Sequence, residues 1–156
     1  MAEAARSLKA MAKSYFSTVF EESAHDIWAA IRDFSNYRWA GVVADTRMED
    51  GKAGDAVGGV RNVRINGGVI RQRLLAHSDL ERSYTYELCD PAPFPVSNYR
   101  ATLRVTPVVD GSRAFVEWWA TFDCAADERE RWTGHFENEG FAKWLQSLRA
   151  HLAAPG

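Results

Sequence analysis

Two tyrosines occupy positions from which they could contact a bound molecule. Successive side chains of a β-strand point to opposite faces, and alternation along residues 98–108 groups Tyr99 with apolar side chains. Residues 82–89 place Tyr86 on an apolar face in the same way. A buried tyrosine hydroxyl needs a hydrogen-bond partner. We therefore expect Tyr86 and Tyr99 to be either plain core tyrosines or hydrogen-bond partners of a bound ligand.

Two further side chains could give such a site its polar groups. Gln72 falls on the apolar face of residues 69–77. An unpaired amide there would cost about 1–3 kcal/mol, so Gln72 should face polar groups in a cavity or at its rim. Arg61 lies on one alternation of residues 58–65 with two apolar side chains. It is either a surface arginine or a buried guanidinium that needs a carboxylate, a carbonyl or a ligand anion.

Alternation along residues 113–124 indicates which face of this predicted strand carries Glu117. Alternation groups Trp118 and Phe122 on one apolar face and leaves Glu117 with Trp119 on the other, which is also mostly apolar. Taken alone, this pattern predicts that Glu117 points to solvent.

A long helix should lie against these strands. Apolar residues recur at helical spacing over residues 127–152, with a charged opposite face. A helix of about six or seven turns needs a large surface, which a curved antiparallel sheet supplies. Phe136, Gly140 and Trp144 fall at i, i+4 and i+8 on one face. A mid-helix glycine costs about 1 kcal/mol relative to alanine, so Gly140 indicates either room for a ligand or a close helix–sheet contact.

Strands and two short helices account for the rest of the chain. Ser23 is a predicted helix N-cap with Asp26 three positions later, and a second short helix should pass through Tyr37 and Trp39. The predicted strands are residues 14–21, 42–48, 58–65, 69–77, 82–89, 98–108 and 113–124, with a tight Asn-Gly-Gly hairpin at 66–68. This order makes one α+β domain over residues 14–154, preceded by a loose or helical tail at residues 1–13.

Composition argues against several classes of function. The chain has a formal net charge of -2, with 46% hydrophobic and 26% charged residues, and no basic block that would suggest nucleic-acid binding. No apolar run is long enough for a membrane span, and the N-terminus lacks the apolar core of a signal peptide. Cys89 and Cys124 form no CxxC pair and the histidines are scattered, so we expect free thiols in the cytoplasm and no metal or cofactor.

Several local motifs, taken in order, resemble one superfamily. They are the segments IWAAIRDFSNYRWA, GGVRNVRI, IRQRLLAHSD, RSYTYEL, NYRATLRVTP and VEWWATFD. Their order and spacing resemble the START-like helix-grip (SRPBCC) superfamily, which includes the bacterial polyketide cyclase/dehydrase-like group, plant lachrymatory factor synthases and abscisic acid receptors. The resemblance implies a curved antiparallel sheet of about seven strands wrapped around a long C-terminal helix, with a ligand cavity between them.

The resemblance also implies roles for individual residues. In the lachrymatory factor synthases an arginine and a glutamate act on a small sulfenic acid, and their positions match Arg61 and Gln72. An amide cannot act as a general acid or base at ordinary pH, which counts against the same chemistry here. The resemblance further implies that Tyr86 and Tyr99 are pocket residues. It also turns Glu117 toward the cavity as the partner of Arg61, with a perturbed pKa.

These observations lead to three hypotheses for function. The first is a carrier or sensor for a small hydrophobic or aromatic ligand, whose entrance is flanked by loops 66–68 and 90–97. The predicted site comprises Arg61, Gln72, Tyr86, Tyr99, Glu117, Trp119, Phe136, Gly140 and Trp144. The second is a metal-independent cyclase, dehydratase or isomerase in which Arg61 and Tyr99 polarise a ligand oxygen and Glu117 moves a proton. The third is an interaction module, because an inward Glu117 leaves Trp118 and Phe122 outside, where the N-terminal tail or a homodimer would cover them.

Overall fold

The predicted order of elements is confirmed by the computed structural model, which describes residues 8–41, 45–65 and 68–153. The strands are β1 (Lys9–Phe20), β2 (Asp45–Met48), β3 (Val60–Ile65), β4 (Gly68–Ser78), β5 (Ser83–Leu88), β6 (Ser97–Val108) and β7 (Arg113–Ala125). The helices are α1 (Ala24–Ile31), α2 (Arg129–Gly134) and α3 (Ala142–Ala153), joined by the short turns η1 (Arg38–Ala40), η2 (Glu49–Gly51) and η3 (Ala126–Glu128) and by η4 (His135–Phe141). Residues 42–44 of the predicted second strand, and the Asn66-Gly67 pair, lie outside the described residues.

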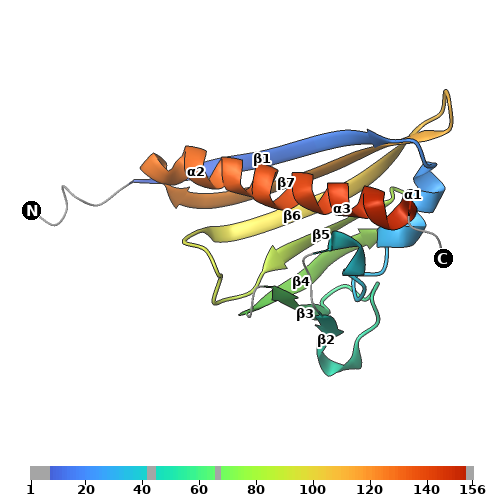
Figure 1. Cartoon of the computed structure of the whole chain (residues 1–156). Helices are drawn as coiled ribbons and strands as arrows, with labels where there is room; N and C mark the ends of the chain where they lie inside the picture. The colour runs from blue at the N-terminus through green and yellow to red at the C-terminus, as the bar shows by residue number, and fades with distance from the viewer. Residues whose placement is uncertain (1–7, 42–44, 66–67, 154–156) are drawn as a thin grey trace, which may run out of the picture.

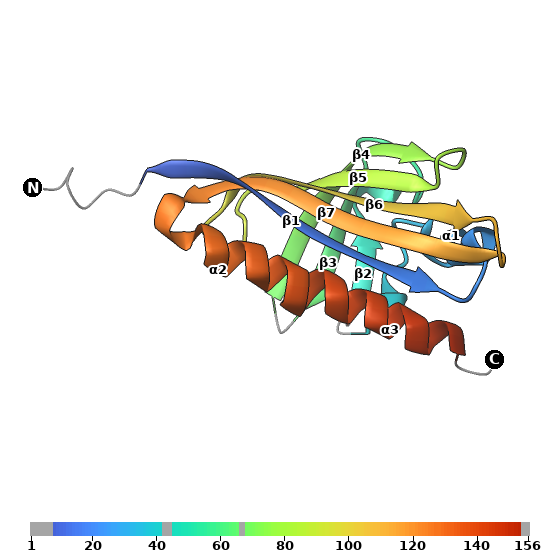
Figure 2. The same cartoon turned by 90° about the horizontal axis from the view of Figure 1, so that it is seen from above.

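The seven strands form one antiparallel sheet in the order β1-β7-β6-β5-β4-β3-β2. The first strand therefore lies beside the last. The pairing register shifts at two places, between Leu74 and Ala76 in β4 and between Ser97 and Arg100 in β6. Such bulges bend a strand and increase its twist. Figures 1 and 2 show the resulting sheet curving around the long C-terminal helical run.

The first strand is longer than the sequence pattern predicted. The sequence pattern assigns residues 9–13 to a loose or helical tail, but β1 begins at Lys9, which pairs with Ala125 of β7. The physical reason is the length of β7, whose backbone groups pair with β1 along its whole extent. The helical run covers the free edge of β1. Ser14 Oγ donates to the Thr133 carbonyl at 3.0 Å, and the Tyr15 amide donates to the Glu137 carboxylate at 3.0 Å. Covering an edge strand in this way protects it from pairing with another chain.

The predicted helices are also present. Ser23 accepts a hydrogen bond from the Asp26 amide at 3.1 Å, which confirms the N-cap of α1. The C-terminal run is helical from η3 to the end of α3, but its middle segment η4 is a π-helix, which the sequence pattern did not predict. Within the described residues, no helix is long and apolar enough to cross a membrane.

The orientation of β7 corrects the prediction for Glu117. Trp118 and Phe122 are buried at 0% and 2% exposure, and the Trp118 ring stacks on Phe141 with centroids 5.0 Å apart. Glu117 therefore lies on the outer face of the sheet. There it accepts a hydrogen bond from the Tyr15 hydroxyl at 2.6 Å and pairs with Arg104 at 3.0 Å.

The prediction that Glu117 faces the cavity and pairs with Arg61 is therefore wrong, and alternation taken alone was right. Burial would raise the pKa of Glu117, but the Tyr15 hydroxyl and the Arg104 charge lower it below its usual value. An interaction module built on Trp118 and Phe122 is also wrong, because both side chains belong to the core of this domain.

Alanine substitutions at the two neighbouring tryptophans distinguish the two faces of β7. Trp118 is fully buried, so Trp118→Ala should lower the free energy of unfolding by about 3–5 kcal/mol. Trp119 lies on the outer face near the Lys13 and Arg104 cations, so Trp119→Ala should cost only about 1 kcal/mol. Urea unfolding followed by circular dichroism measures both losses. Equal losses, or a larger loss for Trp119→Ala, would contradict the assignment.

Candidate functional site

A cavity of about 360 Å³ lies between the sheet and the C-terminal helical run. Strands β3 to β6 form one wall, and residues 135–144 form the other. The lining residues are Tyr37, Ile65, Ile70, Gln72, Tyr86, Leu88, Phe94, Tyr99, His135, Phe136, Glu139, Gly140, Lys143 and Trp144. Mostly apolar lining with a few polar groups is typical of a site for a small organic molecule.

Arg61 lies behind the inner end of this cavity, which is formed by Gln72 and Tyr37. Its side chain is fully buried, with Nε donating to Gln72 Oε1 at 2.6 Å and Nη1 donating to the Phe34 carbonyl at 3.2 Å. The guanidinium carbon lies 3.8 Å from the Phe34 ring centroid and 4.1 Å from that of Tyr37. Within the part of the chain that the structure describes, no carboxylate forms an ion pair with it.

Tyrosine side chains lie beside this cation. Burial raises the pKa of Tyr37 and Tyr86, and the charge of Arg61 only partly opposes this rise, so both phenols stay protonated at neutral pH. The Tyr86 hydroxyl accepts a hydrogen bond from Trp118 Nε1 at 3.2 Å, whereas that of Tyr37 has no partner among the described residues. Within the same residues, the Tyr84 hydroxyl and Arg61 Nη2 also lack a well-aligned hydrogen bond. They nevertheless lie close enough for Arg61 to limit the rise in the Tyr84 pKa that burial causes.

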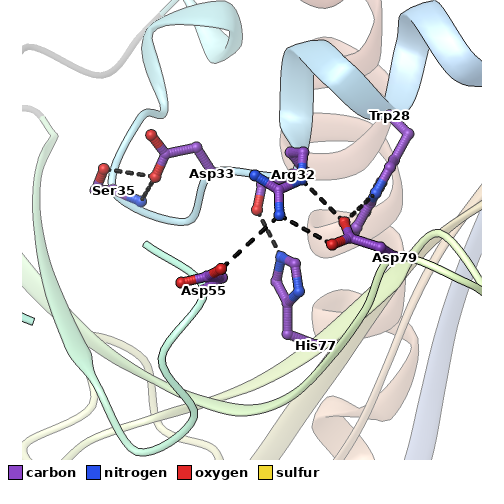
Figure 3. Close-up of polar contacts among 7 residues, drawn as sticks. All are labelled: Trp28, Arg32, Asp33, Ser35, Asp55, His77 and Asp79. Carbon is purple, nitrogen blue, oxygen red and sulfur yellow. Dashed lines mark hydrogen bonds and ion pairs between the residues drawn. The ribbon is translucent and has the colours of Figure 1, made fainter. Parts of the chain in front are cut away.

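A network of polar contacts holds the loop that carries Phe34 and Tyr37 (Figure 3). Arg32, at the end of α1, donates to both carboxylate oxygens of Asp79 at 2.9 and 3.0 Å, and Trp28 Nε1 donates to Asp79 at 2.8 Å. His77 Nε2 lies 2.7 Å from the Arg32 carbonyl.

Further along the same loop, the Phe34 amide donates to the Gly54 carbonyl at 2.9 Å. A Cβ at Gly54 would lie 1.8 Å from the Asp33 carboxylate, so only glycine allows this approach. These contacts fix the position of the two aromatic rings that enclose Arg61.

The Asp79 carboxylate should make stability depend on pH at the acid end. Hydrogen bonds from Arg32 and Trp28 lower its pKa to about 2, against about 3.9 in an unfolded chain. The folded state therefore gains stability from Asp79 above about pH 4 and loses it as the pH falls toward 2. We expect the difference in urea midpoint between wild type and Asp79→Asn to shrink over this range. A difference that stayed constant from pH 6 to pH 2.5 would contradict the network.

The position of Gly140 in the helical wall of the cavity explains why a glycine lies inside this helix. Phe136, Gly140 and Trp144 share the cavity face, as their spacing predicted. The atoms nearest to a Cβ at Gly140 would all belong to the Trp144 ring, at an ordinary contact distance of 3.5 Å or more. None of these nearest atoms belongs to a strand, so space beside Trp144 accounts for the glycine better than a close helix–sheet contact does.

Alanine at Gly140 should therefore be tolerated by the fold. Because glycine costs about 1 kcal/mol relative to alanine inside a helix, Gly140→Ala should raise the free energy of unfolding or leave it unchanged. Gly134→Ala, in α2 outside the cavity lining, is the matched control and should behave similarly. Thermal or urea unfolding measures both, and a loss of more than about 1 kcal/mol for Gly140→Ala alone would show that the site does not tolerate a methyl group.

The cavity brings together most of the predicted site residues. Gln72, Tyr86, Tyr99, Phe136, Gly140 and Trp144 line it. Arg61 lies directly behind Gln72, whereas Glu117 and Trp119 lie on the outer face of the sheet and do not line the cavity. Whether these residues contact a ligand stays a prediction.

Several lining residues were not predicted. His135, Glu139 and Lys143 repeat the spacing of Phe136, Gly140 and Trp144 one residue earlier, so the helical period itself indicates them. They form the mouth of the cavity, where Glu139 and Lys143 are more than half exposed and form an ion pair. Ile65, Ile70 and Leu88 share strand faces with predicted residues, whereas Tyr37 and Phe94 lie in loops that have no period. No group of side chains in the described residues could hold a metal ion.

The family of this chain follows from its sequence. A family model described as polyketide cyclase / dehydrase and lipid transport matches residues 11–154. The chain belongs to this family. The match covers every strand and helix described above except the first two residues of β1. The comparison with curated proteins found no match.

Solved structures share the fold of this polyketide cyclase / dehydrase family member. An uncharacterised protein from Bacillus thuringiensis is 27% identical, with 92% of this chain and 100% of that chain covered and a TM-score of 0.80. A protein from Thermobifida fusca is 28% identical, with 89% and 91% covered and a TM-score of 0.78. Norcoclaurine synthase from Thalictrum flavum has the same fold at 10% identity, with 97% and 99% covered and a TM-score of 0.74.

Proposed function

We propose that this protein binds one small, largely hydrophobic molecule in the cavity between its sheet and its C-terminal helical run, as a carrier or sensor. The observation that supports this proposal is the cavity itself, with about 360 Å³ of space and mostly aromatic and aliphatic lining. Burial of apolar ligand surface would supply affinity, and the few polar groups would set orientation. The description of the family includes lipid transport, which supports the same reading.

Catalysis by the predicted triad has less support. A general base must come within hydrogen-bond reach of the proton that it removes. Glu117 is separated from the cavity by the sheet, and its carboxylate is already bound by Tyr15 and Arg104. Gln72 carries an amide that cannot exchange protons at ordinary pH. The described residues therefore favour binding over an acid–base reaction that uses Arg61, Tyr99 and Glu117.

A solved structure with the same fold supports the proposal that the cavity holds a small molecule. A structure of norcoclaurine synthase from Thalictrum flavum is a complex with dopamine and hydroxybenzaldehyde. At 10% identity this likeness concerns the fold alone, so no residue role is carried over. It supports only the capacity of a helix-grip fold to hold small aromatic molecules.

Native mass spectrometry of the purified protein tests this proposal. We expect a small molecule that co-purifies with the wild type and is released on denaturation. Gly140→Leu should greatly reduce its occupancy, because the new side chain fills the space beside Trp144. Gly134→Leu, on the same helical run outside the cavity, should retain the molecule. Equal occupancy in wild type and Gly140→Leu would contradict binding in this cavity.

A further inference from the structure

The inner end of the cavity carries the positive charge of Arg61, which no side chain in the described part of the chain neutralises. An arginine keeps its charge under all ordinary conditions. A buried cation without an anionic partner is costly, and its field is poorly screened in a medium of low polarity. Asp33 lies on the neighbouring loop, but its carboxylate is exposed and accepts two hydrogen bonds from Ser35. Glu139 lies at the mouth, where it is paired with Lys143.

The polar group beside Arg61 presents a donor to the cavity. Nε of Arg61 can only donate, so the Gln72 oxygen must face it and the Gln72 amide nitrogen must point elsewhere. That nitrogen forms no hydrogen bond within the described residues, and Gln72 lines the cavity. The Tyr37 hydroxyl is fully buried and likewise has no hydrogen-bond partner among the described residues, so the donor that faces the cavity is the Gln72 amide nitrogen. A ligand here meets this donor, while the one carbonyl and the one amide oxygen nearby are already occupied by Arg61.

We propose that the ligand is an apolar carboxylic acid, bound as its carboxylate with the charged group at the Gln72–Tyr37 end. This inference rests on the proposed function and deepens it by naming the ligand class. The carboxylate accepts a hydrogen bond from the Gln72 amide nitrogen and neutralises the charge of Arg61 behind it. The apolar body of the acid lies along Phe94, Phe136 and Trp144, toward the mouth.

A competition experiment tests the ligand class apart from the cavity. The neutral fluorescent probe N-phenyl-1-naphthylamine reports occupancy of the apolar cavity, and 4-phenylbutanoate and 4-phenylbutanamide compete with it at pH 7.5. Because a hydrogen bond to a charged group is worth more than one to a neutral group, we expect the acid to compete about tenfold better than the amide.

Two variants at position 72 identify the source of this preference. Gln72→Glu replaces the amide donor by a negative charge beside Arg61, so it should weaken the acid far more than the neutral amide and remove the advantage of the acid. Gln72→Met keeps the length of the side chain without adding charge, so it should weaken the acid less than Gln72→Glu does. Arg61 itself is left unchanged in these tests, because its removal would disrupt the core.

The outcomes separate the two proposals. If the probe does not bind wild type at all, the cavity is not a binding site and both proposals fall. If the probe binds but acid and amide compete equally, the proposed function stands and the carboxylate inference is overturned. An acid preference that survives in Gln72→Glu would also overturn it, because the positive charge at the inner end would then not be its cause.

Discussion

The buried guanidinium of Arg61 is the constraint on which the rest of the site depends. Removing such a charge from water is costly, and it is tolerated only where hydrogen bonds and other favourable contacts replace the lost water. Gln72 and the Phe34 carbonyl supply the hydrogen bonds, and the faces of Phe34 and Tyr37 enclose the planar group. The loop after α1 must therefore lie against β3, and the Arg32–Asp79 pair holds the start of that loop to the sheet.

The same arrangement decides where the domain stays hollow. On the sheet side of the cavity, the Tyr37 ring packs against the Arg61 guanidinium. On the helix side, the π-helical segment η4 carries Gly140, which has no side chain to fill the cavity. π-Helical segments are rare in proteins and occur frequently at functional sites. The neighbouring aromatic side chains Trp39, Trp118 and Phe141 are fully buried. The cavity thus lies between the buried Arg61 cation and the helical segment that carries Gly140.

The sequence predicted those features of the structure that follow a periodic side-chain pattern. Strand alternation placed Gln72, Tyr86 and Tyr99 on the inner face, and helical spacing placed Phe136 and Trp144 opposite them. The order of elements was sufficient to indicate the fold.

Features that follow neither strand alternation nor helical spacing could not be predicted in this way. Both faces of β7 are mostly apolar, so the orientation of Glu117 depended on its neighbours Tyr15 and Arg104, which come from other strands. The resemblance to other members of the superfamily turned Glu117 inward and was misleading at this one position. Tyr37 reaches the cavity from a loop fixed by tertiary contacts, and the N-terminal start of β1 depended on the length of its partner strand. Such features follow from packing between distant segments, which local patterns do not contain.

The central claim is that Arg61 is a buried, uncompensated cation that responds to a bound anion. Nuclear magnetic resonance of the arginine Nε–H groups in ¹⁵N-labelled protein tests it most directly. We expect one Nε–H signal, assigned to Arg61 by its through-space contacts with the Phe34 and Tyr37 rings, to exchange slowly with water and to shift on addition of 4-phenylbutanoate but little with 4-phenylbutanamide. Rapid exchange of this signal in the free protein, or equal shifts with both compounds, would contradict the account.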